Sequence, residues 1–382
     1  MTDQETQKTK IPLGARIKDW FSTPQGKKKF IIGSLITIVF IGAGVSAYQL
    51  TRPDNPTTKT NETNKNENLP TLEENKPVTT TSKYDGLQYD PAIANRAPLA
   101  AIIENHIDAR PQSGLDKASI VFEAISEGGI TRFLAIYGPQ DAKVIGPVRS
   151  ARTYFLDWVE GIGAFFGHCG GNIDALDRIA KEDVNDLDQF ANSGAYWRDN
   201  SKKVASEHTL FTSTEKLYET AKNKGWNMDA KFDGYTFKDD PKEEQRPTSQ
   251  TIDVKFSTPQ FNVKYSYNPK ENNYNRLMGG VAHKDAQTNE QIKVKNIAVI
   301  EVKRTAGLTR INESGYTMQT TGEGKATIFL DGKTIDGLWK KEKATSMLKF
   351  YDSQGKTVEF NRGNLWIEVL PQGESGVGVT AS

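Results

Sequence analysis

Cysteine and histidine are scarce in this chain of 382 residues, which has one cysteine and four histidines. The single cysteine, Cys169, excludes an intramolecular disulfide bond and a cysteine-rich zinc module. The histidines are His106, His168, His208 and His283, and no two of them form a paired-ligand motif. The spacing therefore predicts no metal site, and no motif indicates a cofactor.

An excess of charge of one sign is also missing. The chain has 49 Lys and Arg against 48 Asp and Glu, a formal net charge of +1. Proteins that bind nucleic acid usually show a basic imbalance, so we expect no nucleic-acid partner. The sequence also has no Gly-x-Ser-x-Gly, no Ser-x-x-Lys with its partner motifs and no His-Glu-x-x-His, so no familiar hydrolase signature is present.

One long apolar run lies near the N-terminus. Residues 30–48 are 19 residues without a charge. At about 1.5 Å per residue, a helix of this length crosses a hydrocarbon core of about 30 Å. Residues 1–29 hold seven Lys or Arg and three Asp or Glu, a net of +4. Because cytoplasmic flanks carry the basic excess, we expect a cytoplasmic leader at 1–29, a transmembrane anchor at 30–50 and an extracytoplasmic remainder.

The apolar run has two other interpretations. Val45-Ser46-Ala47 loosely fits a signal-peptide cleavage site, although the leader and the run are longer than in a usual signal peptide. A buried core helix is disfavoured because the run has no polar face. No cysteine follows the run, which excludes a lipid-modified N-terminal cysteine.

Composition divides the rest of the chain into a linker, two domains and a tail. Residues 51–84 are rich in Thr, Asn, Glu, Lys and Pro and predict a disordered linker, because such a segment buries too little apolar surface to offset its ordering entropy. The charged, proline-bracketed stretch 239–247 separates a first domain, 85–235, from a second domain, 250–372. The Gly/Ser-rich residues 373–382 predict a flexible tail.

The expected fold class is α+β, with a mixed α/β first domain and a mainly antiparallel β second domain behind one transmembrane helix. Apolar runs in the first domain predict strands at 99–103, 120–124, 133–137 and 164–166. Helices are expected at 153–161, 173–179 and 214–224, the last with a Ser/Thr cap before it and Gly225 after it.

Alternation and turn residues define the second domain. Residues 261–267 alternate apolar and polar side chains, which predicts a strand with one buried face. Asp331-Gly332 predicts a hairpin turn between strands at 326–330 and 333–338. Two further apolar runs predict strands at 297–302 and 365–370.

Polar clusters lie at the ends of these predicted elements, where binding residues usually sit on a rigid scaffold. The candidate ligand-binding residues are Glu104, Asn105, Arg110, Glu127, Arg132, Arg149, Arg152 and His168 in the first domain, and His283 and Asp285 in the second. His168 is interpreted either as a general acid or base or as a packed histidine. Cys169 is interpreted as a small buried residue.

Arg149 and Arg152 are the most suggestive pair. They are three residues apart, so they would share a face if the helix began at Pro147. A helix N-terminus favours anions, and two guanidinium groups there would suit a phosphate or carboxylate. The alternative is that they pair with nearby glutamates, Glu104, Glu123 or Glu127, and only hold loops together.

Several short motifs resemble those of the YerB-like family of bacterial envelope lipoproteins. They are ARPQSGL at 109–115, EGGITRF at 127–133, IGPVRSAR at 145–152, HCGG at 168–171, H-x-D at 283–285 and WIEVLP at 366–371. The resemblance implies two paired domains of unknown function in the cell envelope and supplies no catalytic residue. Many members carry a lipobox cysteine, which this chain lacks.

Three functions fit these features. One is a binding or accessory protein of the cell envelope, held at the membrane by residues 30–50, with a cell-wall component or an envelope protein as partner. A second is an extracytoplasmic enzyme that acts on wall polymer through Glu104, Glu127 or His168. The third is a structural spacer.

Overall fold

The computed structural model describes residues 77–382. The predicted leader 1–29, anchor 30–50 and most of the linker 51–84 lie outside the described residues. Within 77–382, none of the helices combines the length and the apolar character needed to span a membrane.

Helices are few and strands are many in this part of the chain. The α-helices are α3 (Pro91–Ala94), α4 (Thr153–Ile162), α5 (Ile173–Lys181) and α6 (Thr214–Asn223). Short 3-10 turns are η1 (Ile107–Ala109), η2 (Leu115–Lys117), η3 (Glu127–Gly129), η4 (Ser193–Ala195), η5 (Ser206–His208), η6 (Glu243–Gln245) and η7 (Pro259–Phe261).

The strands before residue 250 are β1 (Thr80–Thr81), β2 (Gln88–Tyr89), β3 (Leu99–Glu104), β4 (Ile120–Ile125), β5 (Thr131–Tyr137), β6 (Phe165–His168), β7 (Asp186–Asp188), β8 (Trp197–Arg198), β9 (Leu210–Phe211) and β10 (Phe237–Lys238). The strands after it are β11 (Thr251–Lys255), β12 (Val263–Asn268), β13 (Asn273–Met278), β14 (Val281–Ala282), β15 (Lys293–Val294), β16 (Asn296–Val302), β17 (Arg304–Leu308), β18 (Ser314–Met318), β19 (Gly322–Leu330), β20 (Lys333–Lys341), β21 (Lys349–Asp352), β22 (Phe360–Asn361), β23 (Leu365–Pro371) and β24 (Gly378–Ala381).

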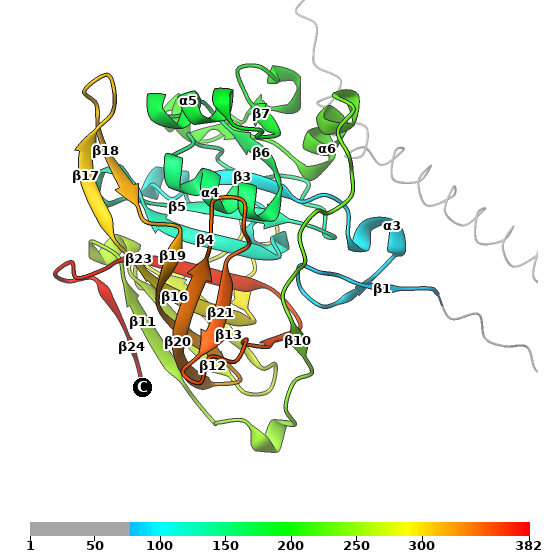
Figure 1. Cartoon of the computed structure of the whole chain (residues 1–382), viewed down its shortest axis with the longest axis vertical. Coiled ribbons are helices and arrows are strands. Elements are labelled where there is room, and N and C mark those ends of the chain that lie inside the picture. The colour runs from blue at the N-terminus through cyan, green and yellow to red at the C-terminus, as the bar shows by residue number, and fades with distance from the viewer. Residues whose placement is uncertain (1–76) are drawn as a thin grey trace, which may run out of the picture. The chain divides into compact units, whose positions relative to one another are not determined.

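A ten-stranded sheet forms the centre of the molecule, in the order β21-β20-β19-β16-β23-β4-β5-β3-β6-β7. Strand β23 pairs in parallel with both β16 and β4, so strands from the first and second predicted domains lie side by side in one sheet (Figure 1). A second, six-stranded sheet contains β11 to β15 and β24.

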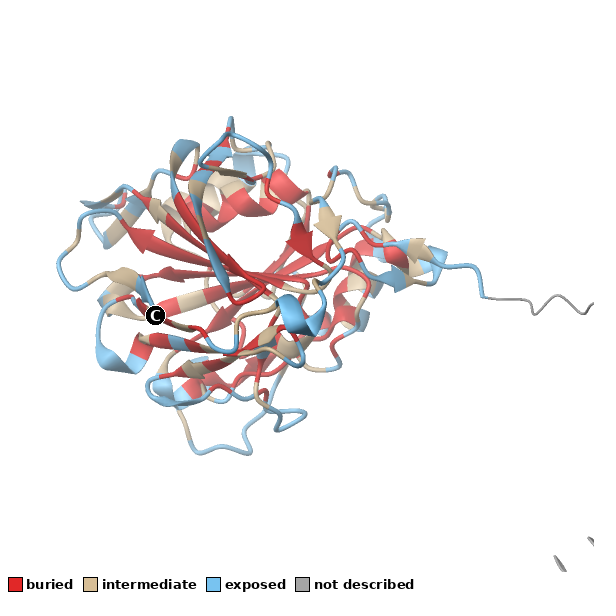
Figure 2. Cartoon of the chain, turned by 90° about the horizontal axis from the view of Figure 1, so that it is seen from below, coloured by how far each residue is buried: buried red, intermediate tan, exposed pale blue. Residues whose placement is uncertain are grey.

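Each face of the large sheet is covered. Helices α4 and α5 pack on one face, where Phe122 of β4 stacks on Trp158 of α4 with ring centroids 4.7 Å apart. The six-stranded sheet and α6 pack on the other face, against side chains such as Val121 and Trp366. Strands β3, β4 and β23 are buried along their whole length because both of their faces are covered (Figure 2).

The apolar patterns predicted most elements correctly. The mixed α/β first part and the mainly β second part are confirmed, with β3, β4, β5, β16 and β23 at the predicted positions. Ser213 Oγ accepts a hydrogen bond from the N–H of Lys216 at 3.2 Å and so caps α6. The hairpin turn between β19 and β20 is confirmed, with φ of +58° at Asp331 and +68° at Gly332.

Two boundaries were wrong. Helix α4 begins at Thr153 and not at Pro147, because residues 148–151 pair with other segments of the same chain. Val148 forms a bridge with Ile103, and Ala151 forms one with Gly171. The predicted strand at 261–267 begins at Val263, since the preceding residues form η7 with a proline at its first position, which suits a helical turn.

The last residues of the chain also take part in a sheet. The segment for which composition predicts a flexible tail, 373–382, contains β24, which pairs antiparallel with β11. Val379 lies opposite Val254 in this register, and its partly buried side chain packs on the core.

Candidate functional site

Five of the predicted residues come together at one end of the large sheet, and we call Glu104, Glu127, Arg132, Arg149 and Arg152 the Arg/Glu cluster. Glu104 ends β3 beside Arg132 of β5. Glu127 lies in η3, between β4 and β5. The N–H of Arg149 donates to a β3 carbonyl oxygen at 2.9 Å, and Arg152 precedes α4. Strand pairing, and not helical spacing, therefore brings the arginines together.

Glu127 is held in a two-pronged ion pair. Arg152 donates from Nη2 to Glu127 Oε2 at 2.7 Å and from Nε to Oε1, while Ser126 Oγ donates to Oε2 at 2.6 Å. Burial acts to raise the pKa of Glu127, but Arg152, Ser126 and Arg132 together lower it to about 2. Glu127 is ionised at neutral pH and has no proton to give as a general acid.

Arg132 lies beside two other guanidinium groups. Its Nη1 donates to the carbonyl oxygen of Ser150 at 3.0 Å, and its Nη2 lies 3.5 Å from Glu127 Oε2. Burial and the like charges of Arg152 and Arg149 lower the pKa of Arg132 to about 10, against the attraction of Glu127. Three guanidinium groups face two carboxylates here, so the cluster has an excess of positive charge.

Arg149 is the most accessible arginine of the cluster. Its side chain is 27% exposed, compared with 11% for Arg132 and 12% for Arg152. Its Nε donates to Glu104 Oε1 at 3.0 Å, whereas Nη1 and Nη2 have no hydrogen-bond partner among the described residues. Arg149 therefore has two nitrogens with which to bind an incoming anion.

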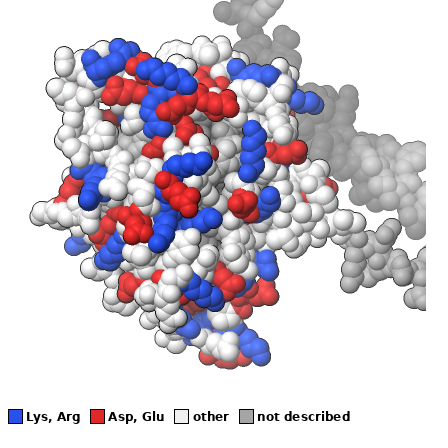
Figure 3. Space-filling model, viewed as in Figure 1, with Lys and Arg blue, Asp and Glu red and all other residues white. Residues whose placement is uncertain are grey.

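One face of the described residues has mixed charge. Figure 3 shows Lys and Arg side chains interleaved with Asp and Glu over this face, without a broad field of one sign. A ligand would therefore be recognised locally, by a cluster of side chains, and not by a long-range field.

His168 is fully buried at the end of β6. Its Nδ1 lies 2.8 Å from the carbonyl oxygen of Gly170, and its Nε2 lies 2.9 Å from Asp186 Oδ1. Both ring nitrogens are thus occupied by neighbours within the fold. The neighbouring Cys169 is half-buried, and burial raises the pKa of its thiol. These contacts favour the packed alternative for His168 over a role in acid–base chemistry.

Asn105, Arg110 and His283 belong to a separate network between the two sheets. Asn105 Nδ2 donates to Thr131 Oγ1 at 2.6 Å, and its Oδ1 accepts from Arg110 Nε at 3.1 Å. Gln112 donates to Asn105 Oδ1 at 2.8 Å and its Oε1 lies 3.0 Å from His283 Nε2. The network joins a loop of the first predicted domain to a loop of the second.

Arg276 on β13 is the centre of this network and was not predicted. It has no exposed surface and donates to Glu123 Oε2, to His283 Nδ1 and, at 3.1 Å, to the Tyr265 hydroxyl. Its guanidinium lies over the Trp366 ring, 4.5 Å from the centroid. Alternation along β13 was the available signal, because Arg276 occupies an inward position between two buried residues.

The same network shifts the pKa values of two other groups, Glu368 and His283. Burial and repulsion by Glu123 raise the pKa of Glu368 to about 8, in spite of the charge of Arg276. The Oε2 atom of Glu368 is buried without a hydrogen-bond partner in the described structure. Burial and the nearby charge of Arg276 lower the pKa of His283 well below its usual value. His283 is therefore neutral at physiological pH.

Asp285 connects the same two loops at another point. Its Oδ2 accepts from the N–H of Gly114 at 2.6 Å, and its Oδ1 accepts from the N–H of Gln287 at 2.8 Å. Burial, with the like charge of Asp116, raises the pKa of Asp285, although the two backbone N–H groups oppose this. Asp285 therefore lies apart from the Arg/Glu cluster and holds a turn.

The larger surface hollows of residues 77–382 lie elsewhere. One of about 780 Å³ is lined by residues that include Arg96, Asp141 and Tyr218, and another of about 700 Å³ by residues that include Leu338, Tyr351 and Asp352. The predicted site residues line neither of them. The Arg/Glu cluster therefore lies outside both of these hollows.

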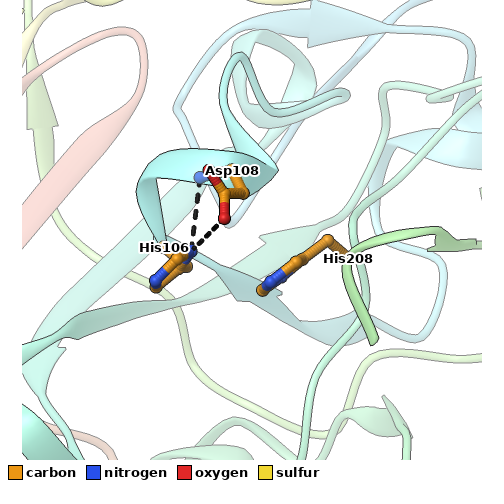
Figure 4. A group of neighbouring side chains, drawn as sticks. All are labelled: His106, Asp108 and His208. Atoms are coloured by element: carbon orange, nitrogen blue, oxygen red, sulfur yellow. Dashed lines mark hydrogen bonds and ion pairs between the residues drawn. The ribbon is translucent and has the colours of Figure 1, made fainter. Parts of the chain in front are cut away.

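Two histidines that are far apart in sequence stack on each other. His106 follows β3 and His208 ends η5, and their ring centroids are 4.9 Å apart with planes within 8°. Asp108 of η1 lies beside them, and one side-chain ligand atom from each of the three residues lies within 4.8 Å of the others (Figure 4). Sequence spacing carried no signal for this group, because only the tertiary fold brings His208 to β3.

Comparison with known proteins finds two family models in series. The family described as "Protein of unknown function (DUF3048)" matches with its N-terminal domain over residues 85–227 and with its C-terminal domain over residues 252–367. The Arg/Glu cluster falls in the first match, and Arg276 and His283 fall in the second.

A relative and a solved structure agree with these models. YerB of Bacillus subtilis (strain 168), named as a candidate lipoprotein, is 31% identical over 294 residues, which is 75% of this chain and 85% of YerB. The crystal structure of YerB from Bacillus subtilis is similar with a TM-score of 0.70 at 28% identity, and the match covers 79% of this chain and 99% of that one. The resemblance seen in the sequence motifs is confirmed.

Proposed function

We propose that this chain, which belongs to the YerB-like family with paired DUF3048 domains, is an extracytoplasmic accessory protein of the bacterial cell envelope that binds an anionic ligand. The observation that carries the proposal is Arg149, which is partly exposed and has two unpartnered nitrogens beside two further arginines. A phosphate or carboxylate group of a wall polymer matches this geometry.

The electrostatics of the cluster support an anion. Arg132 and Arg152 share the single carboxylate of Glu127, and Arg149 takes one oxygen of Glu104. Burial, and after it the like charges of Arg152 and Arg149, lower the pKa of Arg132, and the like-charge part reflects the free-energy cost of crowding cations. A bound anion would offset this repulsion and would gain hydrogen bonds from Arg149.

The proposed location follows from the N-terminal segment. Residues 30–50 would anchor the chain in the membrane by a single helix, with the leader inside. The end of the predicted linker belongs to the folded part, because β1 lies at Thr80–Thr81 and Tyr84 is buried, so only residues 51–76 would hold that part away from the lipid surface. The YerB relative, named as a candidate lipoprotein, is consistent with a membrane-associated place in the envelope. In this proposal the chain uses a helix where that relative would use a lipid.

Protease treatment of intact cells tests this topology. A protease added outside should remove the folded part and leave a fragment that carries an N-terminal epitope tag in the membrane fraction. A chain that is recovered intact after this treatment, but is cleaved after lysis, would contradict the proposed orientation.

Binding of the full-length chain in detergent to poly(glycerol phosphate), a model anionic wall polymer, tests the ligand class. We expect binding that weakens as salt rises and that falls roughly tenfold with Arg149→Gln, about the effect of one lost charge-assisted contact. Arg362→Gln is the matched control, because Arg362 is a partly exposed arginine paired with Asp239, away from the cluster. Equal binding by wild type and Arg149→Gln would refute the assignment.

A further inference from the structure

We propose that His106, Asp108 and His208 bind a divalent transition metal ion of the zinc class. The three residues offer two imidazole nitrogens and one carboxylate oxygen, with one atom of each within 4.8 Å of the others (Figure 4). This donor set suits Zn²⁺, whereas Mg²⁺ and Ca²⁺ prefer oxygen ligands alone. The proposal stands on this geometry and does not depend on the anion site.

Glu104 holds the His208 ring in an orientation that suits a metal ligand. The Nδ1 of His208 donates to Glu104 Oε2 at 2.8 Å, and Glu104 is itself held by Arg149 at 3.0 Å. Metal-binding histidines usually donate their second ring N–H to a carboxylate, which fixes the ring and its tautomer. The Nε2 of His208 then keeps its lone pair, and no hydrogen bond within the described residues occupies it.

The distances between the ligand atoms are somewhat longer than those around a bound Zn²⁺, so the side chains would move together when the ion binds. His106 Nδ1 and Asp108 Oδ2 are 3.6 Å apart, and Nδ1 also accepts a long hydrogen bond of 3.3 Å from the N–H of Asp108, which a metal bound at Nδ1 would replace. Two ligands at about 2.1 Å from a tetrahedral Zn²⁺ are about 3.4 Å apart and can never be more than about 4.2 Å apart. The two histidine rings are stacked with planes within 8°, so the His106 ring would have to rotate out of the stack before both imidazole lone pairs could point at one ion. The His106 and Asp108 side chains are 32% and 54% exposed, which leaves them room to make this movement toward the buried His208.

Three protein ligands leave at least one coordination position open. The position would hold water or a ligand atom from a bound molecule. Because the second oxygen of Glu104 binds Arg149, the metal site and the Arg/Glu cluster share one carboxylate. Binding of Zn²⁺ to His208 would therefore affect the contact between Glu104 and Arg149.

Isothermal titration of Zn²⁺ into the full-length, tag-free chain in detergent tests the proposal. A histidine tag must be avoided, and residues 1–76 contain no histidine or cysteine. We expect one Zn²⁺ per chain with micromolar or tighter affinity, and no comparable binding of Mg²⁺. His106→Ala and Asp108→Asn should each weaken binding at least tenfold, and Glu104→Gln should weaken it about 10- to 100-fold.

Asp183→Asn is the matched control for Asp108→Asn, because Asp183 is an exposed aspartate that does not belong to the three-residue group and should leave Zn²⁺ affinity unchanged. Co²⁺ provides a second readout: its visible absorption should show a four- or five-coordinate spectrum in the wild type that His106→Ala abolishes. Since His106 and Asp108 are partly exposed, both variants should fold. Absence of Zn²⁺ binding by the wild type, or binding by His106→Ala and Asp108→Asn at wild-type strength, would overturn the proposal.

Discussion

Arg276 and Glu123 form an ion pair in which neither side chain has any exposed surface, and each comes from a different sheet. Arg276 lies on β13 of the six-stranded sheet and Glu123 on β4 of the ten-stranded sheet. The two residues also fall in the two different family matches. Removal of one partner would leave the other charge buried and unpaired, so the pair ties the two halves together.

Arg276→Met should be strongly destabilising. Methionine fills a similar volume but leaves Glu123 without its main partner, and loss of one member of a buried pair costs about 3 to 5 kcal/mol. Chemical denaturation of the full-length chain in detergent, followed by near-UV circular dichroism, would measure the change in the free energy of unfolding.

Lys293→Met is the control for this substitution. Lys293 pairs with Glu271 at 2.6 Å, but both side chains are about half exposed, so its loss should cost less than about 1 kcal/mol. If Arg276→Met were no more destabilising than Lys293→Met, the buried pair would not hold the sheets together.

Glu368 should make the folded chain less stable as pH rises into the alkaline range. Its pKa is raised from 4.5 to about 8 in the folded chain, chiefly by burial. Between pH 4.5 and about 8, Glu368 keeps a proton in the folded chain that it releases in the unfolded chain. The stability contributed by this bound proton is therefore full below pH 4.5 and is lost as pH rises through about 8. Glu368→Gln, which is neutral at every pH, should flatten the fall in melting temperature between pH 6 and pH 9.

Glu359→Gln is the control for the pH profile. Glu359 is exposed, so its neutral replacement should keep the wild-type dependence on pH. A Glu368→Gln profile parallel to that of the wild type would show that Glu368 does not titrate in this range.

Strand and helix positions were predictable because they depend on local patterns. The alternation at Val263, Tyr265 and Tyr267 and the Asp331-Gly332 turn are each encoded within a few residues. The start of α4 was missed because residues 148–151 bond to β3 and to the segment after β6, and such partners are distant in sequence.

The site was only partly predictable for the same reason. Glu104, Glu127 and Arg132 lie near neighbouring strand ends of one sheet, so position along the chain was informative. Arg276 and His208 acquire their partners only in the folded chain. A charged residue at an inward strand position is the signal that would have identified Arg276, whereas His208 has no comparable signal.

Glu127→Gln should destabilise the chain at neutral pH and less so in acid. The pKa of Glu127 is lowered from 4.5 to about 2 in the folded chain. The ionised carboxylate therefore contributes to the stability of the fold above pH 4.5, and this stability is lost as pH falls through about 2. Because its side chain is 34% exposed, we expect a loss of only about 1 kcal/mol at pH 7. The difference in melting temperature between variant and wild type should shrink from pH 7 to pH 3.

Glu290→Gln, at an exposed glutamate without an ion pair in the described structure, should show no such trend. A Glu127→Gln difference that stayed constant down to pH 3 would mean that lost packing, and not lost charge, explains its effect.

Gly337 should not tolerate alanine, because β20 and β21 approach each other closely at this position. A Cβ atom on Gly337 would lie 1.9 Å from the carbonyl oxygen of Tyr351, a backbone atom that cannot turn aside. Gly337→Ala should therefore push the strands apart and cost about 1 to 3 kcal/mol of stability. Gly307→Ala is the matched strand control, since a Cβ atom there would meet nothing within 4 Å and should change stability by less than about 0.5 kcal/mol. Equal melting temperatures for the two variants would contradict the close pairing of β20 with β21, and with it the outer edge of the ten-stranded sheet.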